Sequence, residues 1–153
     1  MAEERKIKIV QRNKKAYFDY EILDKLEAGL VLTGSEVKSI RDGKVSIREA
    51  YAKIRGGEAW VVGMDISTYP QAGPYNNHEP RRARKLLLHR REIRRLVGKI
   101  REKGLTLVPL ALYFKEGLAK LEIGLGRGKA KYDKRQAIQD REAKRDLRRR
   151  AMK

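Results

Sequence analysis

The sequence has no cysteine and only two histidines, His78 and His89. The missing cysteines exclude a disulfide framework and every zinc site that is built on thiolates. Two histidines are too few for a histidine-rich metal site, and no motif with the spacing of metal ligands surrounds them. We therefore expect this chain to carry neither a metal ion nor a cofactor.

Long hydrophobic runs are also missing. No stretch approaches the ~18 apolar residues that a membrane-spanning helix needs. The polar start Met1–Lys6 leads into no apolar segment of the kind found in a signal peptide. Phosphate-binding loops and the Gly-x-Ser-x-Gly nucleophile motif are absent as well. These absences predict a cytoplasmic protein that is neither a membrane protein nor an enzyme.

Positive charge is what the sequence has in excess. Its 38 Lys and Arg against 20 Asp and Glu leave a formal net charge of +18 in 153 residues. Self-repulsion of this size is costly unless a polyanion offsets it. With a membrane surface disfavoured, nucleic acid is the expected partner. The length suits a single domain, and because no extra apolar stripe is present we expect a monomer.

Composition divides the chain into three regions. Residues 1–12 are basic and weakly patterned, which predicts a loose N-terminal arm. Residues 13–125 alternate short apolar runs with glycine, as expected of a folded domain. Residues 126–153 hold 12 Lys or Arg and 4 Asp or Glu, with few large apolar side chains. This basic tail has high helix propensity but no packing stripe, so we expect it to be disordered when free.

The folded region reads as mainly β. A Gly56-Gly57 link and a Lys115–Gly117 link each predict a hairpin. Apolar residues at helical spacing predict a docked helix over 90–103, closed by Gly104. A second, short helix is expected over 35–41 with Ser35 as its N-cap. About six strands with one long helix predict a small closed OB-like β-barrel. The expected strands are 20–23, 28–33, 50–55, 58–63, 105–114 and 118–125.

The most basic run of the domain is Arg81–Arg91, at the expected junction of a loop with the long helix. Guanidinium groups bind phosphate in a fork, and a dense positive cluster releases counterions on meeting RNA. Inside the run, Leu86-Leu87-Leu88 cannot all face one side of a strand or helix. Two readings stay open: all three are core residues, or at least one lies at the surface against a sugar or base.

Two further segments allow alternative interpretations. The tail either folds as a helix against an RNA surface or adds affinity through charge alone. Tyr17-Phe18 and Tyr20, near Lys14-Lys15, either stack on bases beside phosphate-binding lysines or begin a strand of the barrel. His89 near Glu92 suggests a small nuclease, but the start of a helix explains this pair equally well.

Four blocks in the same order resemble the small protein B family, and the match runs from Asn13 into the tail. The resemblance implies an OB-like barrel that binds the tRNA-like half of transfer-messenger RNA and carries it into stalled ribosomes. It also implies that the tail enters the empty mRNA channel of the small subunit, near the decoding centre, and becomes helical there. The blocks are Asn13–Ala16, Glu27–Ser39, Arg84–His89, and Gly128-Lys129 with Asp133–Arg135.

The resemblance also suggests residue roles. Asn13, Glu27 and Leu87 match family positions that are important for RNA binding, and Asp133–Arg135 match a tail motif needed after binding. With their neighbours, the expected RNA-binding set is Asn13, Lys14, Lys15, Glu27, Arg84, Lys85, Leu87 and His89. The expected set for engaging the ribosome is Gly128, Lys129, Lys131, Tyr132, Asp133, Lys134 and Arg135.

The chain departs from the family pattern in two places. Tyr17-Phe18 stand where Arg-His is common, which removes one charge and one ring nitrogen. Ala130 stands where the tail motif commonly has a second lysine after its glycine. The alternative to ribosome rescue is a general OB-type nucleic-acid-binding or ribosomal protein whose tail is only an electrostatic arm.

Overall fold

The computed structural model describes residues 6–129 and 131–151, and for residues 131–134, 136, 137 and 151 the description covers the backbone alone. The predicted mainly-β protein with helices is confirmed over these residues. In chain order the elements are β1 (Ile7–Arg12), α1 (Lys14–Asp19), β2 (Tyr20–Leu30), α2 (Gly34–Arg41), β3 (Val45–Ser46), β4 (Tyr51–Arg55), β5 (Glu58–Val62), β6 (Asp65–Ile66), the short 3-10 helix η1 (Pro70–Ala72), β7 (Arg84–Leu87), α3 (Arg90–Lys103), β8 (Thr106–Lys115), β9 (Leu118–Gly128) and α4 (Lys131–Ala151).

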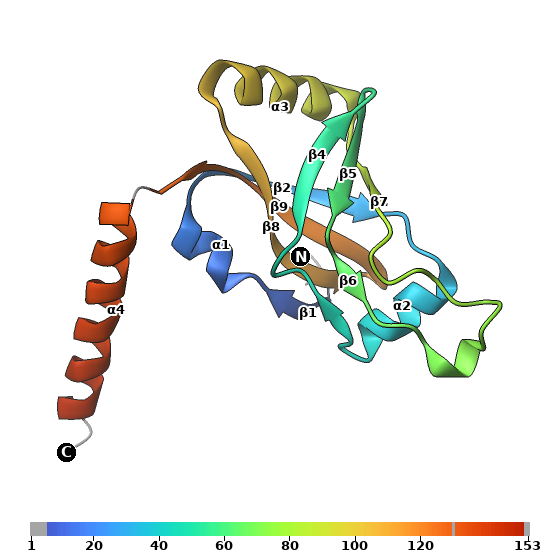
Figure 1. Ribbon diagram of the computed structural model, residues 1–153, viewed down its shortest axis with the longest axis horizontal. Coiled ribbons are helices and arrows are strands. Elements are labelled where there is room, and N and C mark those ends of the chain that lie inside the picture. Colours follow the sequence, from blue (N-terminus) through green and yellow to red (C-terminus); the bar gives the residue numbers. More distant parts are fainter. Residues whose placement is uncertain (1–5, 130, 152–153) are drawn as a thin grey trace, which may run out of the picture.

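The strand pairings close into a ring. Antiparallel ladders run in the order β8-β4-β5-β7-β2-β9, and β9 pairs back onto β8. Strand β1 lies outside the ring as a further partner of β8, and β3 with β6 forms a separate two-stranded ladder. Figure 1 shows α3 over one end of the ring, whereas α1 lies between the sheet and α4. The ring therefore has an inside, which holds the core, and an outward side.

Alternation along the strands decides which residues fill the inside. On β9, Leu121, Ile123 and Leu125 are buried, whereas Lys120 and Glu122 point outward. This alternation is typical of a sheet with one buried face. Each large apolar side chain removed from water in this way contributes about 1.5–3 kcal/mol. The inward residues of the other strands include Ala28, Ala52, Val61, Leu86, Leu107 and Leu112.

The long helix agrees with its prediction. Helix α3 covers Arg90–Lys103, its residue Leu96 is buried against the core, and Gly104 ends it in the left-handed conformation with φ of 61°. The shorter helix α2 corrects a detail, because its N-cap is Thr33 rather than Ser35. Ser35 lies inside the helix, buried, with its Oγ 2.9 Å from His78 Nδ1. The cap lies two residues earlier because Glu36 closes a capping box with Thr33.

Three strand predictions are corrected. The expected strands 20–23 and 28–33 form the single strand β2, whose polar residues face outward while both of its edges are paired. Residues 84–87 form strand β7, where a junction of loop and helix was expected. Residues 7–12 were expected in a loose arm, but they pair with β8 as β1. In each case pairing partners far along the chain override a weak local pattern.

The tail is helical in the structure, where a segment disordered in the free protein was expected. Helix α4 projects away from the ring (Figure 1), and its described side chains are exposed. Its composition of Ala, Arg, Lys, Glu and Gln accounts for the helix. No helix within the described ranges combines the length and the low charge that crossing a membrane requires.

Candidate nucleic-acid interface

The outward side of the ring brings together residues that are far apart in sequence. Cross-strand register sets Glu27 opposite Glu122 and Gly29 opposite Leu87, and residues two apart on a strand share a face. We call this surface the sheet face. It is formed by Tyr113 and Lys115 on β8, Lys120 and Glu122 on β9, Glu27 on β2, and Lys85 and Leu87 on β7.

Glu27 is held in its charged form on the sheet face. The Tyr113 hydroxyl donates a hydrogen bond to Glu27 Oε2, and Lys115 Nζ lies 3.4 Å from the same oxygen. The bond from Tyr113 lowers the pKa of Glu27 despite some burial. Burial and the same bond raise the pKa of Tyr113. Glu27 therefore presents an ionised carboxylate that accepts hydrogen bonds, which suits a base edge or a 2′-hydroxyl better than a phosphate.

Leu87 lies at the surface, so the reading that buries all three leucines is wrong. Its exposed fraction is 54%, whereas Leu86 is 2% exposed and Leu88 is partly buried. The side chain lies over Gly29, where an added Cβ would stand 3.2 Å from Leu87 Cβ. The alternation of strand β7 separates Leu86 from Leu87. An apolar side chain thus stands on a charged face, in a position to pack on a sugar or a base.

Lys85 shares this face with Leu87. Its Nζ lies 3.3 Å from Glu58 Oε1, and both side chains are half exposed. An exposed pair of this kind contributes at most about 1 kcal/mol, so the ammonium group can exchange Glu58 for a phosphate at little cost. The expected RNA-binding residues Glu27, Lys85 and Leu87 therefore form one surface.

Arg84 does not belong to that surface. Its side chain and that of Glu36 are both 0% exposed, and Arg84 Nε donates to Glu36 Oε2 at 2.6 Å. A second guanidinium nitrogen, Nη1, donates to the carbonyl of Met64 at 2.6 Å. A side chain with no exposed surface cannot touch RNA, so the expected RNA contact at Arg84 is corrected to a structural ion pair. Strand β7 forces this outcome, because Arg84 and Leu86 alternate inward with Leu87 outward.

Arg82 completes the ion pair from the other side. Its Nη2 lies 2.5 Å from Glu36 Oε1, and the Thr33 backbone N–H donates to the same oxygen at 2.9 Å. Burial alone would raise the pKa of Glu36, but these bonds and those from Arg84 lower it. Burial lowers the pKa of Arg84 against the attraction of Glu36. Two of the arginines that the sequence assigned to an RNA-binding run therefore hold helix α2 against strand β7.

Asn13 is likewise committed to the fold. It is 5% exposed, and its amide nitrogen donates to the carbonyl of Pro109 at 3.0 Å. Its Oδ1 accepts from the Ala16 N–H at 3.2 Å, which makes Asn13 the N-cap of α1. The bulge of β8 at Pro109 presents this carbonyl. Asn13 therefore ties α1 to β8. It also belongs to the lining of a cavity beside α1, and the expected RNA contact stays a prediction.

His89 is the N-cap of α3, and it is exposed. The His89 N–H donates to Glu92 Oε1 at 3.0 Å, three residues ahead, in a capping box. This local bond accounts for the His–Glu pair without a nuclease site. His89 remains accessible at the end of the strand that carries Leu87.

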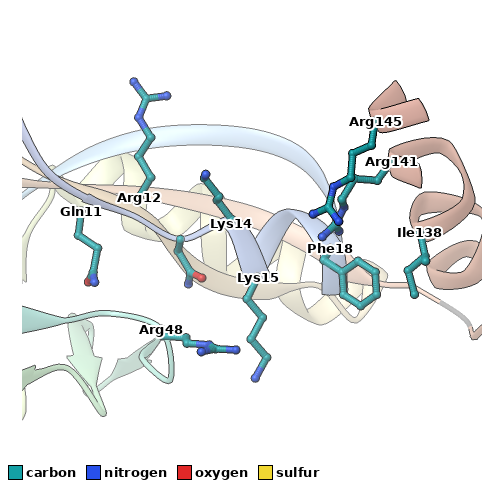
Figure 2. A pocket seen from close by; sticks show the side chains of 10 residues that line it. Gln11, Arg12, Lys14, Lys15, Phe18, Arg48, Ile138, Arg141 and Arg145 are labelled. Atoms are coloured by element: carbon teal, nitrogen blue, oxygen red, sulfur yellow. The ribbon is translucent and has the colours of Figure 1, made fainter. Parts of the chain in front are cut away.

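A second charged surface lies between α1 and α4, and we call it the basic groove. It is a cavity of about 880 Å³, and Figure 2 shows its side chains. Among the residues that the structure describes, no Asp or Glu belongs to the lining, although Lys15 Nζ also lies 3.3 Å from Glu49 Oε1 outside it. A concave surface lined by one sign of charge attracts a phosphate backbone. Its basic residues are Arg12, Lys14, Lys15, Arg48, Arg141 and Arg145.

The aromatic pair lies on helix α1 rather than at the start of a strand. Phe18 reaches the basic groove, where the Arg141 guanidinium lies 5.5 Å from the centre of its ring, and Figure 2 shows α4 meeting Phe18. Tyr17 points the other way, with Lys25 Nζ 5.3 Å from its ring centre. Tyr17 and Phe18 therefore do not begin a barrel strand, whereas Tyr20, the third aromatic residue of this segment, is the first residue of β2. Stacking on a base stays a prediction.

The tail motif spans the junction of β9 and α4. Gly128 ends β9, and Lys129 fixes the junction because its Nζ donates to the Tyr17 carbonyl at 3.0 Å. Arg135 is exposed on α4. The predicted side-chain roles of the four residues that begin the helix, and the departure at residue 130, lie outside the described residues. These four residues are Lys131, Tyr132, Asp133 and Lys134.

Several residues of the two surfaces were missed by the sequence analysis. Arg141 and Arg145 are four apart, a spacing that places them on one side of a helix and could have marked them. Arg12 was assigned to a loose arm, so its position beside α1 was not expected. Arg48 and Tyr113 gave no local signal, because only the folded chain brings them to the groove and to the sheet face.

Comparison with known proteins finds similar proteins over most of the chain. A family model described as SmpB protein matches residues 10–153. An SsrA-binding protein of Carboxydothermus hydrogenoformans is 57% identical over 92% of this chain and 93% of its own length. Another, from Thermosynechococcus vestitus, is 55% identical over 96% of both chains. A solved structure described as “tmRNA-SmpB: a journey to the center of the bacterial ribosome” has a TM-score of 0.65 and 48% identity, covering 84% of this chain and 93% of that chain.

Proposed function

This chain belongs to the SmpB family, and on that premise we propose that it binds transfer-messenger RNA and works with it on the ribosome, in the rescue of stalled translation. Its relatives are SsrA-binding proteins, and its structural neighbour is a transfer-messenger RNA partner on the bacterial ribosome. The protein binds the tRNA-like half of that RNA.

The observation that carries the proposal is the sheet face. It gathers an ionised acceptor at Glu27, an exposed apolar group at Leu87 and a weakly paired cation at Lys85 on one surface. Folded RNA offers the matching groups, namely 2′-hydroxyls and base edges, sugar and base faces, and phosphates. A surface for phosphate alone would need neither the carboxylate nor the leucine.

The basic groove supplies the second contact. We infer that the sheet face holds the tRNA-like RNA while the groove and the tail meet ribosomal RNA, in the decoding centre and mRNA channel of the small subunit. The tail motif from Gly128 to Arg135 engages the ribosome after the RNA is bound. The strand ring is a barrel of the OB type, residues 13–125 form the RNA-binding unit, and the protein acts as a cytoplasmic, non-catalytic monomer.

The alternative is a general nucleic-acid-binding protein with an electrostatic arm. The basic groove by itself favours it, because cations lining a cavity bind any phosphate backbone. The two functions differ in selectivity, since counterion release does not distinguish one RNA from another.

The test is to measure binding of the full chain to the tRNA-like half of transfer-messenger RNA and to an elongator tRNA, at roughly 0.15 M salt and across a salt titration. We expect a preference for the former that persists as salt rises, because hydrogen bonds and apolar contacts are screened less than long-range attraction. Equal affinities that fall together with salt would establish the alternative.

Adjacent leucines give a matched pair of variants. Leu87→Ala is expected to weaken binding of the tRNA-like RNA by ~1–3 kcal/mol, while urea unfolding changes by less than about 1 kcal/mol because the side chain is already exposed. Leu86→Ala should do the reverse, lowering the free energy of unfolding by about 2–5 kcal/mol with the affinity of the folded protein retained. Loss of stability in Leu87→Ala without loss of affinity would remove Leu87 from the interface.

A further inference from the structure

A pocket on the outward side of the sheet has a lining that differs from the rest of this basic protein. We call it the outer pocket. It has a volume of about 360 Å³ and lies across β1, β8, β9 and β2, with one wall from α1. Its apolar and aromatic lining includes Ile7 and Ile9, which are 54% and 44% exposed, together with Tyr17 and Tyr113. Exposed apolar and aromatic side chains around a concavity mark a place for a flat, partly apolar ligand.

The lining of the outer pocket includes two carboxylates, besides the Arg12 guanidinium and two tyrosine hydroxyls. Glu27 and Glu122 stand directly opposite each other on β2 and β9. Like charges in this position destabilise a sheet. Glu27 Oε2 accepts from Tyr113, and Lys115 Nζ stands 3.4 Å from it. Within the described residues, no hydrogen bond or ion pair reaches the Glu122 carboxylate. The pocket therefore has acceptor capacity that the fold does not use.

These carboxylates decide which part of an RNA can enter. A phosphate would meet two negative charges beside it and would be repelled. A base is uncharged, stacks on an aromatic ring such as Tyr17, and can donate hydrogen bonds. Arg12 belongs to the lining and Lys25 Nζ lies 5.3 Å from the centre of the Tyr17 ring. These two cations can bind the phosphates that flank an inserted base.

The four bases differ in what they offer to a carboxylate. Guanine carries two adjacent donors, N1–H and the N2 amino group, on its Watson–Crick edge. Adenine and cytosine each place a ring nitrogen acceptor beside their amino group, and uracil places its N–H between two carbonyls. An acceptor beside a carboxylate is repelled. Guanine alone can bind one carboxylate through two parallel hydrogen bonds.

We propose that the outer pocket binds an unpaired guanine of the RNA, with Glu122 accepting from N1–H and the N2 amino group, Tyr17 stacking on the base, and Glu27 fixed beside it by Tyr113. This specificity pocket rests on the proposed function, because the guanine belongs to the tRNA-like half of transfer-messenger RNA. Glu122 and Tyr17 are thereby assigned as base-recognition residues of the sheet face.

The experiment replaces each unpaired guanine of the tRNA-like RNA, one at a time, with inosine, which lacks the N2 amino group. At one position the full chain should bind at least about fivefold more weakly. The same inosine should not change the affinity of the Glu122→Gln variant. That variant no longer has the two carboxylate oxygens that accept from N1–H and the N2 amino group. Glu21→Gln, an equal charge change on an exposed residue of β2 outside the pocket, should respond as the unmodified protein does.

Urea unfolding checks that the variants fold, and Glu122→Gln should be at least as stable as the unmodified protein because it removes a like-charge pair. If no inosine changes affinity while the tRNA-like RNA is still selected over elongator tRNA, the guanine pocket is refuted and the proposed function stands. If the chain binds the tRNA-like RNA and elongator tRNA equally well, the guanine pocket and the proposed function are both refuted. If Glu122→Gln weakens ribosome binding with no effect on RNA affinity, the pocket receives a cationic protein side chain and the proposal is refuted.

Discussion

Arg84→Met is expected to lower the free energy of unfolding by about 3–5 kcal/mol, the cost of leaving a buried charge without its partner. Glu36 has no exposed side-chain surface, and Arg84 is both its closest buried cation and a donor to the carbonyl of Met64. Arg82, which is partly exposed, and the Thr33 N–H remain bonded to Glu36 Oε1, but Oε2 loses its buried cation. Urea unfolding followed by circular dichroism measures the loss.

Lys85→Met is the matched control, because Lys85 is the next residue on the same strand and was expected to have the same role. Its ion pair with Glu58 is exposed, so stability should change by less than about 1 kcal/mol, whereas affinity for the tRNA-like RNA should fall. The double variant Glu36→Gln with Arg84→Met should recover part of the stability, because it removes the stranded charge. If Arg84→Met were as stable as the unmodified protein and defective only in RNA binding, the structural assignment of Arg84 would be wrong.

The free energy of unfolding at low pH is a second test of the ion pair between Glu36 and Arg84. Because the folded protein lowers the pKa of Glu36 below its ordinary value of 4.5, the ionised carboxylate stabilises the fold fully above that value. The contribution is lost as the pH falls through the lower, folded pKa. The difference in unfolding free energy between the unmodified protein and Glu36→Gln should therefore shrink in acid, and a constant difference would contradict the ion pair.

Deleting residues 132–153 is expected to abolish peptide tagging on stalled ribosomes while leaving binding of the tRNA-like RNA mostly intact. The sheet face, with Glu27 and Leu87, lies on the ring and keeps its geometry without α4. The basic groove, in contrast, loses Arg141 and Arg145 together with the helix. Filter binding and a reconstituted tagging reaction measure the two effects separately.

The control for this deletion is Arg141→Gln with Arg145→Gln, which preserves the helix and removes two of its groove cations. We expect tagging to fall and the salt dependence of binding to ribosomal RNA to become less steep, since fewer phosphates are neutralised. The electrostatic-arm alternative gives the opposite result, in which the deletion destroys binding of the tRNA-like RNA itself.

Several features of this protein were determined by its sequence alone. Charge excess identified nucleic acid as the partner, because net charge is a sum that folding does not change. Helix α3 and the hairpin of β8 and β9 followed from periodicity and turn residues that act within a few positions. The family resemblance rested on blocks of sequence, and the family match over residues 10–153 agrees with it.

Tertiary structure decided which charged residues are available. Arg84 and Lys85 are adjacent and were predicted to bind RNA together, yet strand alternation buries one and exposes the other. The bond from the Asn13 amide to the carbonyl of Pro109 gave no signal in the sequence, because the two residues lie far apart in the chain. Glu122 gave no signal, because its register with Glu27 depends on how two distant strands pair. Sequence sets the local pattern, but burial and register depend on contacts between residues far apart in the chain, and these determined the candidate site.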